Sequence, residues 1–294
     1  MQPASPKGLK IWWLASRPRT WFASISPVLL GSAMAMKDGF FDPLLFFFTL
    51  MTALSIQIGT NLANDYFDFK KGADTSSRVG PVRVTQAGLA SEKAMKLAIF
   101  IAFAAAALCS VYLIIQGGPI MMGLVALSII LGLAYTAGPF PIAYIGLSEV
   151  FILFFFGSLA VAGTYFLQTG VWGKEAWFVG MAPGLISSAI VVVNNLRDET
   201  QDRLAGKKTL IVRFGKGFGK AEYLFFILGA MAIPMLFFKD HPLALLSWLA
   251  LPPAIPQIIA IFRETDPKMI GAILPKTGQI LFFYTLLLSI GWML

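Results

Sequence analysis

The sequence predicts an all-α, polytopic membrane protein with a single domain over residues 1–294. Of these 294 residues, 57% are hydrophobic and 13% charged, and the mean hydropathy is +0.75. Soluble domains carry about 25% charged residues. The apolar residues form runs close to the length of about 20 residues that a helix needs to span a bilayer. We therefore expect about nine transmembrane helices and no separate soluble domain.

Nine apolar runs mark the expected helices. They lie at residues 20–36, 43–64, 94–115, 119–136, 146–168, 177–196, 221–238, 243–262 and 278–294. The third and fourth runs meet at residues 116–119, a segment that includes two glycines and a proline and is too short for anything but a tight hairpin. The two long polar loops lie at 65–93 and 197–220.

Positive charge predicts the orientation of the chain. With nine spans, the N-terminus and every second loop share one side, which carries 20 of the 23 Lys and Arg residues. The opposite side carries only Lys37, Lys174 and Lys239. Such residues gather in cytoplasmic loops, so we expect a cytoplasmic N-terminus and an external C-terminus, in a prokaryotic cell membrane. The net charge of +8 then indicates contact with membrane lipid or an anionic substrate, not with nucleic acid.

Acidic residues follow the second and the sixth expected spans. Asp65 and Asp68 are three positions apart, and Asp198 and Asp202 are four apart. If each helix continues, each pair shares one helix face. At about 6 Å and an effective dielectric constant of about 20, each like-charge pair repels by about 2–3 kcal/mol before solvent screening. A bound divalent cation would remove that repulsion.

Helix capping is the alternative interpretation, because Asp and Asn are common where helices begin. Both of these spans run from the outside to the inside, so both acidic pairs lie at helix C-termini, where the helix dipole disfavours carboxylates. An even number of spans separates the pairs, so both reach the same rim of the bundle. We therefore favour a functional site over capping.

Mg²⁺ prefers oxygen ligands, and phosphate groups of the substrate usually complete its coordination. A diphosphate attached to a lipid tail would fit both these ligands with their neighbouring basic loops and the apolar interior of the bundle. The expected catalytic and metal-binding carboxylates are Asp65, Asp68, Asp198 and Asp202. The further candidate oxygen ligands are Asn64, Asp74 and Asn195. The basic residues expected to bind the diphosphate, each of which also fits the cytoplasmic charge bias, are Lys71, Arg78, Arg83 and Lys207.

At these two segments the chain resembles the UbiA superfamily of intramembrane aromatic prenyltransferases, whose acidic motifs are N-D-x-x-D-x-x-x-D and D-x-x-x-D. The first motif departs from this pattern at its last position, which is Gly72, with Asp74 two residues later. With the R-x-G-P-x-R that follows, this departure is similar to the branch that prenylates 1,4-dihydroxy-2-naphthoate. Further matches lie at residues 17–20, 135–139, 144–149 and 194–210.

The resemblance implies a helical bundle around a central cavity that the loops at 65–93 and 197–220 cap. It also implies Mg²⁺ as cofactor, a prenyl diphosphate donor and an aromatic acceptor. In the naphthoate branch carbon dioxide leaves the attacked carbon, so a strong general base is not obligatory, and the single histidine, His241, is expected on the outer side. Tyr135 is expected in the acceptor pocket, with an interfacial anchor as the alternative.

Two alternative functions stay open. Another acceptor within the same superfamily, such as 4-hydroxybenzoate, homogentisate, haem or a glycerol phosphate lipid, would use the same acidic motifs. A secondary transporter would also place polar residues in its spans, although its site would more often lie near the midplane of the membrane. The sequence assigns no oligomeric state.

Overall fold

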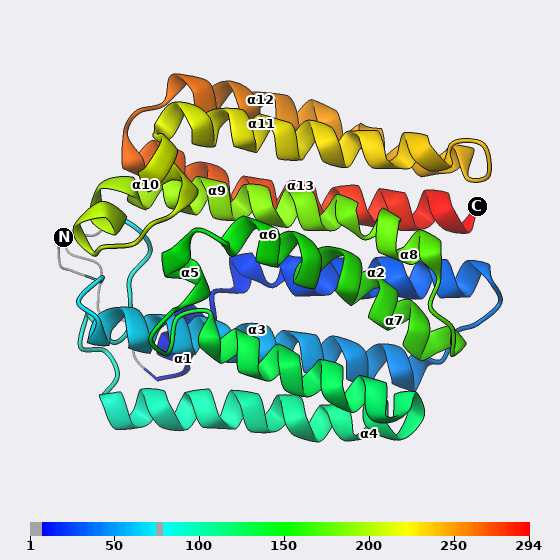
Figure 1. The fold of residues 1–294 in the computed structure, drawn as a ribbon, viewed down its shortest axis with the longest axis horizontal. Coiled ribbons are helices and arrows are strands. Elements are labelled where there is room, and N and C mark those ends of the chain that lie inside the picture. The colour runs from blue at the N-terminus through cyan, green and yellow to red at the C-terminus, as the bar shows by residue number, and fades with distance from the viewer. Residues whose placement is uncertain (1–7, 75–78) are drawn as a thin grey trace.

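The computed structural model describes residues 8–74 and 79–294, and every regular element within these ranges is helical. The long helices run side by side along the long axis of the molecule (Figure 1). A short helix, α1 (Leu9–Ser16), lies at the same end of the bundle as α5 (Ile142–Ile145) and α10 (Leu210–Phe214). The C-terminus lies at the opposite end.

Among the described residues, seven helical segments are long and apolar enough to cross a membrane, with mean hydropathies from 1.4 to 2.6. They are α3 (Pro43–Lys70), α4 (Glu92–Ala134), α6 with α7 (Ser148–Thr169), α8 with α9 (Lys174–Leu204), α11 with a 3-10 turn (Lys216–Phe237), a 3-10 segment with α12 (Pro242–Arg263), and α13 (Pro267–Met293). The apolar α2 (Phe22–Lys37) is shorter. The all-α membrane class is therefore confirmed.

Helix α4 contains the predicted hairpin. Gly118 has φ 66° and ψ −159°, a conformation that L side chains rarely adopt, and Pro119 follows it. The chain reverses there, so that α4 consists of two antiparallel helices (Figure 1). Side chains such as Phe100 and Leu108 stay 70% and 73% exposed, as expected of a surface that faces lipid. The number of nine membrane crossings stays a prediction.

Several predicted boundaries were wrong. Helix α3 continues to Lys70, so the loop predicted at 65–93 begins after that residue. Helix α9 continues to Leu204, and α10 takes up part of the loop predicted at 197–220. Helix α13 begins at Pro267 and not at residue 278. Hydropathy missed the last turns of α3 and α9 because their charged side chains, such as Asp68 and Asp202, are buried inside the protein.

Helix α6 (Ser148–Leu153) and the π-helical segment that joins it to α7 (Leu159–Thr169) pack on α9 (Met181–Leu204) through glycines. A Cβ atom at Gly184 would lie 2.5 Å from the backbone oxygen of Leu153, and one at Gly157 would lie 2.7 Å from that of Gly180. Only glycine lets two helix backbones approach so closely. This contact sets the distance between α6 and α9, and both helices contribute side chains to the site described below.

Residues 154–158, between α6 and α7, form a π-helical segment. One extra residue per turn shifts the side chains that follow it around the helix axis. Phe155 and Phe156 both line the internal cavity, whereas Phe154 is 45% exposed. The segment therefore turns two consecutive aromatic rings toward the interior.

Gly184→Val is expected to destabilise the protein by about 2–4 kcal/mol, because the new side chain would meet the backbone of α6. The measurement is the thermal unfolding midpoint in detergent. The matched control is Gly123→Ala on α4, where a Cβ atom would meet nothing within 4 Å. Equal midpoints for the two variants would contradict the close α6–α9 contact.

Candidate active site

A cavity of about 300 Å³ lies inside the bundle and receives side chains from residues between Arg17 and Leu274. Its charged and amide residues come mainly from the ends of α3 and α9 and from the loops that follow them. They are Arg17, Gln57, Asn61, Asn64, Asp68, Asp74, Arg83, Asn194, Asn195, Asp198, Gln201, Asp202 and Lys207. The structure therefore brings most of the predicted site residues to one cavity. Arg78 lies outside the described residues.

Both acidic helices end in the same backbone motif. After α3, Gly72 adopts φ 69° and the N–H of Ala73 donates to the carbonyl of Asp68 at 2.9 Å. After α9, Gly206 adopts φ 73° and the N–H of Lys207 donates to the carbonyl of Asp202 at 2.9 Å. This is the Schellman motif, which needs a residue with positive φ just past the helix end.

The motif explains why glycine stands at the last position of the first acidic motif. An aspartate at Gly72 would have to adopt the left-handed conformation. The turn carries the chain back over the end of α3, and Asp74 becomes a buried member of the cavity wall. Its carboxylate lies 3.1 Å from Nε of Arg83. Asp74 therefore supplies the third carboxylate of this segment from the loop.

Asp65 holds a loop and does not line the cavity. Its two oxygens accept the backbone N–H groups of Val84 and Thr85, each at 2.9 Å, and the side chain is 1% exposed. Arg83 directly precedes these two residues and points back to the end of α3. Asp65 thus fixes the loop that presents Arg83 to the cavity, a role that its spacing to Asp68 could not reveal.

Asp68 contacts four side chains of the described residues. Oδ1 accepts the hydroxyl of Tyr144 at 2.9 Å, and Oδ2 accepts Nδ2 of Asn64 at 3.1 Å. Arg83 and Lys207 each place a nitrogen 3.7 Å from Oδ2. Two loops therefore bring positive charge to one carboxylate at the end of α3.

Asn64 lies between two arginines. Its Oδ1 accepts NH2 of Arg17 at 2.7 Å and NH1 of Arg83 at 2.8 Å. A carbonyl oxygen has two lone pairs, so both are in use in this conformation. Asn64 therefore acts here as a connector between cations, and binding a metal would require it to exchange a partner. Arg17, which adopts φ 51°, was not singled out as a site residue by the sequence interpretation.

In the second motif, Asp198 forms a bidentate pair with the neighbouring Arg197, with distances of 2.7 and 2.6 Å. The same guanidinium donates to Oδ1 of Asn194 at 2.7 Å. Arg197 is 6% exposed and packs against Gly271 of α13, where a Cβ atom would lie 2.8 Å from its Cδ. The neighbouring helix therefore holds this arginine in place.

Lys207 joins the two motifs. Its ammonium lies 3.3 Å from Oδ1 of Asp202 and 3.7 Å from Oδ2 of Asp68. Burial by itself would lower the pKa of Lys207, but the carboxylates of Asp68 and Asp202 raise it above its ordinary value. The lysine is therefore charged, and a positive charge already stands between the two acidic helix ends.

Tyr144 on α5 was missed as a site residue. The ammonium groups of Lys71 and Lys207 each lie 4.8 Å from its ring centroid, a cation–π distance. Lys71 also donates to the carbonyl of Thr136 at 2.8 Å, and burial lowers the pKa of this lysine. Burial and the Asp68 carboxylate raise the pKa of Tyr144, so it stays a neutral donor. Tyr144 begins the family match at residues 144–149, but the sequence predicted an uncharged loop there and assigned no site residue to it.

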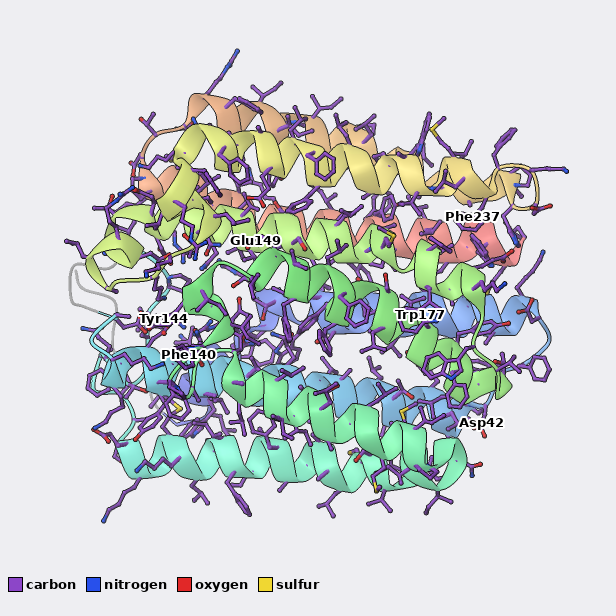
Figure 2. The ribbon with its side chains drawn as sticks, viewed as in Figure 1. Asp42, Phe140, Tyr144, Glu149, Trp177 and Phe237 are labelled. Carbon is purple, nitrogen blue, oxygen red and sulfur yellow. The ribbon has the colours of Figure 1, made fainter. Side chains whose placement is uncertain are left out.

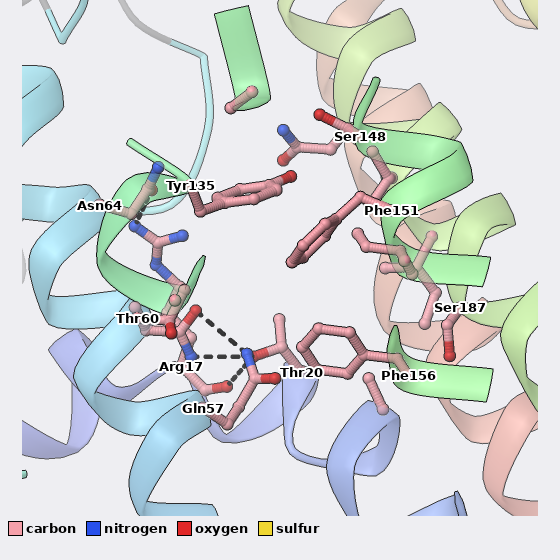
Figure 3. A pocket seen from close by; sticks show the side chains of 18 of the residues that line it. Arg17, Thr20, Gln57, Thr60, Asn64, Tyr135, Ser148, Phe151, Phe156 and Ser187 are labelled. Atoms are coloured by element: carbon pink, nitrogen blue, oxygen red, sulfur yellow. Dashed lines mark hydrogen bonds between the residues drawn. The ribbon is translucent and has the colours of Figure 1, made fainter. Parts of the chain in front are cut away.

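One wall of the cavity is aromatic and the facing wall is polar (Figure 3). Tyr135 lies 6.1 Å from Phe151, whose ring stacks on Phe155 at 4.5 Å. Across the opening lie Arg17 and Gln57. The predicted placement of Tyr135 in the cavity is therefore consistent with the structure, and a flat ring with polar substituents would match both walls.

Within the described residues, no three acidic side chains converge closely enough to bind one metal ion in this conformation. The carboxylate oxygens of Asp68 and Asp202 are nevertheless the hard ligands that Mg²⁺ prefers, and Lys207 shows that a cation fits between them. The present nitrogen–oxygen distances exceed the Mg–O distance of about 2.1 Å. These residues therefore fit a divalent cation if the carboxylates move inward and Lys207 moves aside.

A helical membrane bundle with two acidic helix ends at one cavity defines an intramembrane enzyme of the prenyltransferase type. The chain belongs to the UbiA prenyltransferase family, whose model matches residues 24–293. It is 35% identical to the 1,4-dihydroxy-2-naphthoate octaprenyltransferase of Escherichia coli (strain K12), over 95% of this chain and 94% of the relative. It is 32% identical to the protein of the same name from Bacillus subtilis (strain 168), over 96% and 92%.

Solved structures show the same fold at low sequence identity. The apo structure of a UbiA homologue from Aeropyrum pernix K1 matches with a TM-score of 0.68 and 14% identity, over 91% of this chain and 96% of that one. The structure of a UbiA homologue from Archaeoglobus fulgidus bound to DMAPP and Mg²⁺ matches with a TM-score of 0.60 and 13% identity, over 95% and 99%. The protein is thus an integral membrane protein with the UbiA fold.

Asp65→Ala is expected to release the loop that carries Arg83, because two hydrogen bonds to a buried carboxylate are lost, a loss of about 2–4 kcal/mol. Trypsin should then cleave after Arg83, which is 8% exposed in the intact protein, several times faster. Mass spectrometry of the fragments measures this. Asp65→Asn keeps one acceptor oxygen and should fall in between.

The control is Glu92→Gln, which removes an exposed carboxylate from the ion pair with Lys70 at the far end of the same loop. Its cleavage rate should match that of the unmodified protein. An unchanged cleavage rate in Asp65→Ala, together with lost Mg²⁺ binding, would assign Asp65 to the metal and not to the loop.

Proposed function

We propose that the protein transfers a polyprenyl chain from a prenyl diphosphate to 1,4-dihydroxy-2-naphthoate, with release of diphosphate and carbon dioxide, to give demethylmenaquinol. The observation that carries the proposal is the meeting of Asp68, Asp198 and Asp202 with Arg83 and Lys207 at one end of a cavity with an aromatic wall. The names of the bacterial relatives support the choice of acceptor.

Mg²⁺ is the proposed cofactor. Asp68, Asp198 and Asp202 would hold it, since they line the cavity and supply oxygen ligands. The ion would neutralise the diphosphate as it departs. A homologous fold bound to DMAPP and Mg²⁺ supports this assignment. We propose Asp65 and Asn64 as residues that hold Arg83, and Asp74 as the carboxylate that pairs with it.

The basic residues would bind the diphosphate. When Asp68 and Asp202 turn to the metal, Lys207 loses both of these ion-pair partners and Arg83 loses Asp68, so both basic groups become available to phosphate oxygens. Lys71, whose ammonium lies 4.8 Å from the ring centroid of Tyr144, adds a third positive charge. Arg78 was predicted for the same role from its place in this loop.

The reaction needs three electron-pair movements. The allylic carbon–oxygen bond breaks and its electron pair goes to the diphosphate. The ring carbon that bears the carboxylate then forms a bond to the terminal prenyl carbon. The bond to the carboxylate breaks as carbon dioxide leaves, and its pair restores the aromatic ring. Phe151, Phe155 and Phe156 would exclude water from the cation in the meantime.

No proton has to be removed from the attacked carbon, which fits the placement of His241. This histidine stacks on Trp292 with ring centroids 3.9 Å apart, and its Nε2 lies 3.9 Å from Glu175. Its backbone N–H donates to Phe237, which lies at the far end of the bundle from Tyr144 (Figure 2). The histidine is therefore remote from the cavity.

We further propose that the acidic end of the bundle faces the cytoplasm, in a prokaryotic cell membrane. The loops at that end carry most of the Lys and Arg residues, as the distribution of positive charge requires. The prenyl chain would lie among the apolar residues of the cavity and surrounding membrane lipid.

The direct test is to incubate the purified protein with 1,4-dihydroxy-2-naphthoate, a prenyl diphosphate and Mg²⁺, with and without a chelator. We expect a prenylated, decarboxylated product by mass spectrometry that disappears with the chelator and returns when Mg²⁺ is added back. Preference for 4-hydroxybenzoate or another ring would move the protein to a different branch. Inactivity of the folded protein with every acceptor would contradict the proposal and favour a transporter.

The carboxylates that line the cavity should be indispensable. Asp68→Asn, Asp198→Asn and Asp202→Asn are each expected to lower kcat/KM by about 100-fold or more, because each removes charge that holds the metal and diphosphate. Glu199→Gln is the matched control, since Glu199 lies on the same helix but pairs with Arg203 away from the cavity. Normal turnover in two of the three aspartate variants would contradict the assignment.

A further inference from the structure

Glu149 is a buried acid with no assigned role. It lies in the first turn of α6 and is 2% exposed. It does not line the cavity, but Nδ2 of Asn195, which does, donates to its Oε1 at 2.8 Å. Its other oxygen, Oε2, has no hydrogen-bond partner among the described residues. A buried carboxylate is unfavourable where an apolar side chain of similar volume would pack. Among the described residues, the side-chain amide of Asn195 is therefore the side-chain group that hydrogen-bonds this carboxylate, through Oε1.

This hydrogen bond determines which way the Asn195 amide points. An asparagine side chain carries two donors on nitrogen and an acceptor on oxygen, and its partners decide the orientation. A carboxylate oxygen accepts, so Glu149 holds the nitrogen of Asn195 on its own side. The amide is planar, so Oδ1 points away from Glu149. Within the described part of the chain, no hydrogen bond to that oxygen is recorded.

The position of Glu149 is itself rigid. The hydroxyl of Ser188 donates both to the backbone oxygen of Glu149 at 2.9 Å and to that of Gly184 at 3.0 Å. The glycine contact between α6 and α9 lies one turn further along. Glu149 and Asn195 are thus held on two helices whose separation is fixed by backbone contact.

Asn195 lies where the acidic and the aromatic parts of the cavity meet. It precedes Asp198 by about one helical turn on α9, on the side toward the membrane interior. Ser148, next to Glu149, lines the cavity together with Tyr135 (Figure 3). Glu149 lies in the same half of the bundle as Tyr144 (Figure 2). Oδ1 of Asn195, between the acidic and the aromatic parts of the cavity, can accept a hydrogen bond from a hydroxyl group of a ring bound against the aromatic wall.

We propose that Glu149 is a positioning residue that orients Asn195, so that Oδ1 of Asn195 accepts a hydrogen bond from a hydroxyl group of the aromatic acceptor. This inference rests on the proposed function, because it requires a hydroxylated ring in the cavity. Glu149 acts only through Asn195 and does not touch the acceptor itself.

The test is a double-mutant cycle with Glu149→Leu, Asn195→Ala and the double variant, read as separate KM values for the acceptor and for the prenyl diphosphate. Each single variant should raise the KM for 1,4-dihydroxy-2-naphthoate about tenfold, the effect of one lost hydrogen bond. The KM for the prenyl diphosphate and the Mg²⁺ requirement should stay within about twofold, since other groups bind them. The double variant should be no worse than Asn195→Ala.

Two further variants separate orientation from packing. Glu149→Gln keeps an acceptor oxygen toward Asn195 and should stay within about threefold of the unmodified protein. Ser188→Ala removes one hydrogen bond to the backbone of Glu149, but the glycine contact between α6 and α9 still holds the carboxylate in place, so the acceptor KM should not change. If Ser188→Ala behaves like Glu149→Leu, the role of Glu149 is in packing and the proposal fails.

Two other results would also overturn it. Additive effects in the cycle would show that Glu149 acts independently of Asn195. A rise in the Mg²⁺ requirement or in the prenyl diphosphate KM would place the Asn195 oxygen on the metal and not on the ring. If the unmodified protein prefers another hydroxylated ring, the same cycle is run on that ring. Inactivity with every such ring would remove the proposed function and this inference together.

Discussion

The structure depends on one constraint, which is that carboxylates buried at the end of an apolar bundle must each meet a positive charge or an N–H donor. An isolated buried carboxylate is too costly to keep ionised. Here Asp65 meets backbone N–H groups, and Asp198 meets its neighbour Arg197. Asp68 meets Arg83 and Lys207 from two loops and the hydroxyl of Tyr144 from α5. The hydrogen bonds and ion pairs between these aspartates and the loop residues hold the loops over the helix ends.

The aspartates differ in how firmly their partners are held, and this difference determines which pairs a substrate can replace. Asp65 and Asp198 are paired with groups held by the adjoining backbone or by a packed helix, so their partners have little freedom. Asp68 and Asp202 share Lys207, whose flexible side chain rises from the turn after α9. A substrate that brings its own cation and anion can replace this shared lysine on both carboxylates at once. The exchange leaves the two hydrogen bonds of Asp65 intact, so the loop that carries Arg83 need not move.

The sequence predicted the class of fold and the meeting of the two acidic segments, because hydropathy sets the spans and their parity sets which rim each segment reaches. It could not assign different roles to Asp65 and Asp68, because their spacing places both on one helix face. Only the fold of the loop shows that the N–H groups of Val84 and Thr85 donate to Asp65. The sequence also did not predict the role of Tyr144 or the π-helical segment, because both depend on tertiary contacts. The helical turns beyond residue 64 were missed because hydropathy does not register polar side chains buried by loops.

The placement of the acids at helix C-termini gives a physical reason for a metal in the proposed reaction. A helix N-terminus binds phosphate directly through its free N–H groups and positive dipole end. A C-terminus presents the negative end of the dipole, and the aspartates of α3 and α9 add to it. Such a site repels diphosphate unless a cation stands between them. Lys207 supplies one positive charge at that position, whereas a divalent ion supplies two and leaves the lysine free to hold the anion. The negative dipole ends and the aspartates together repel the diphosphate of the donor unless the metal is bound. Binding of the donor and binding of the metal therefore depend on each other.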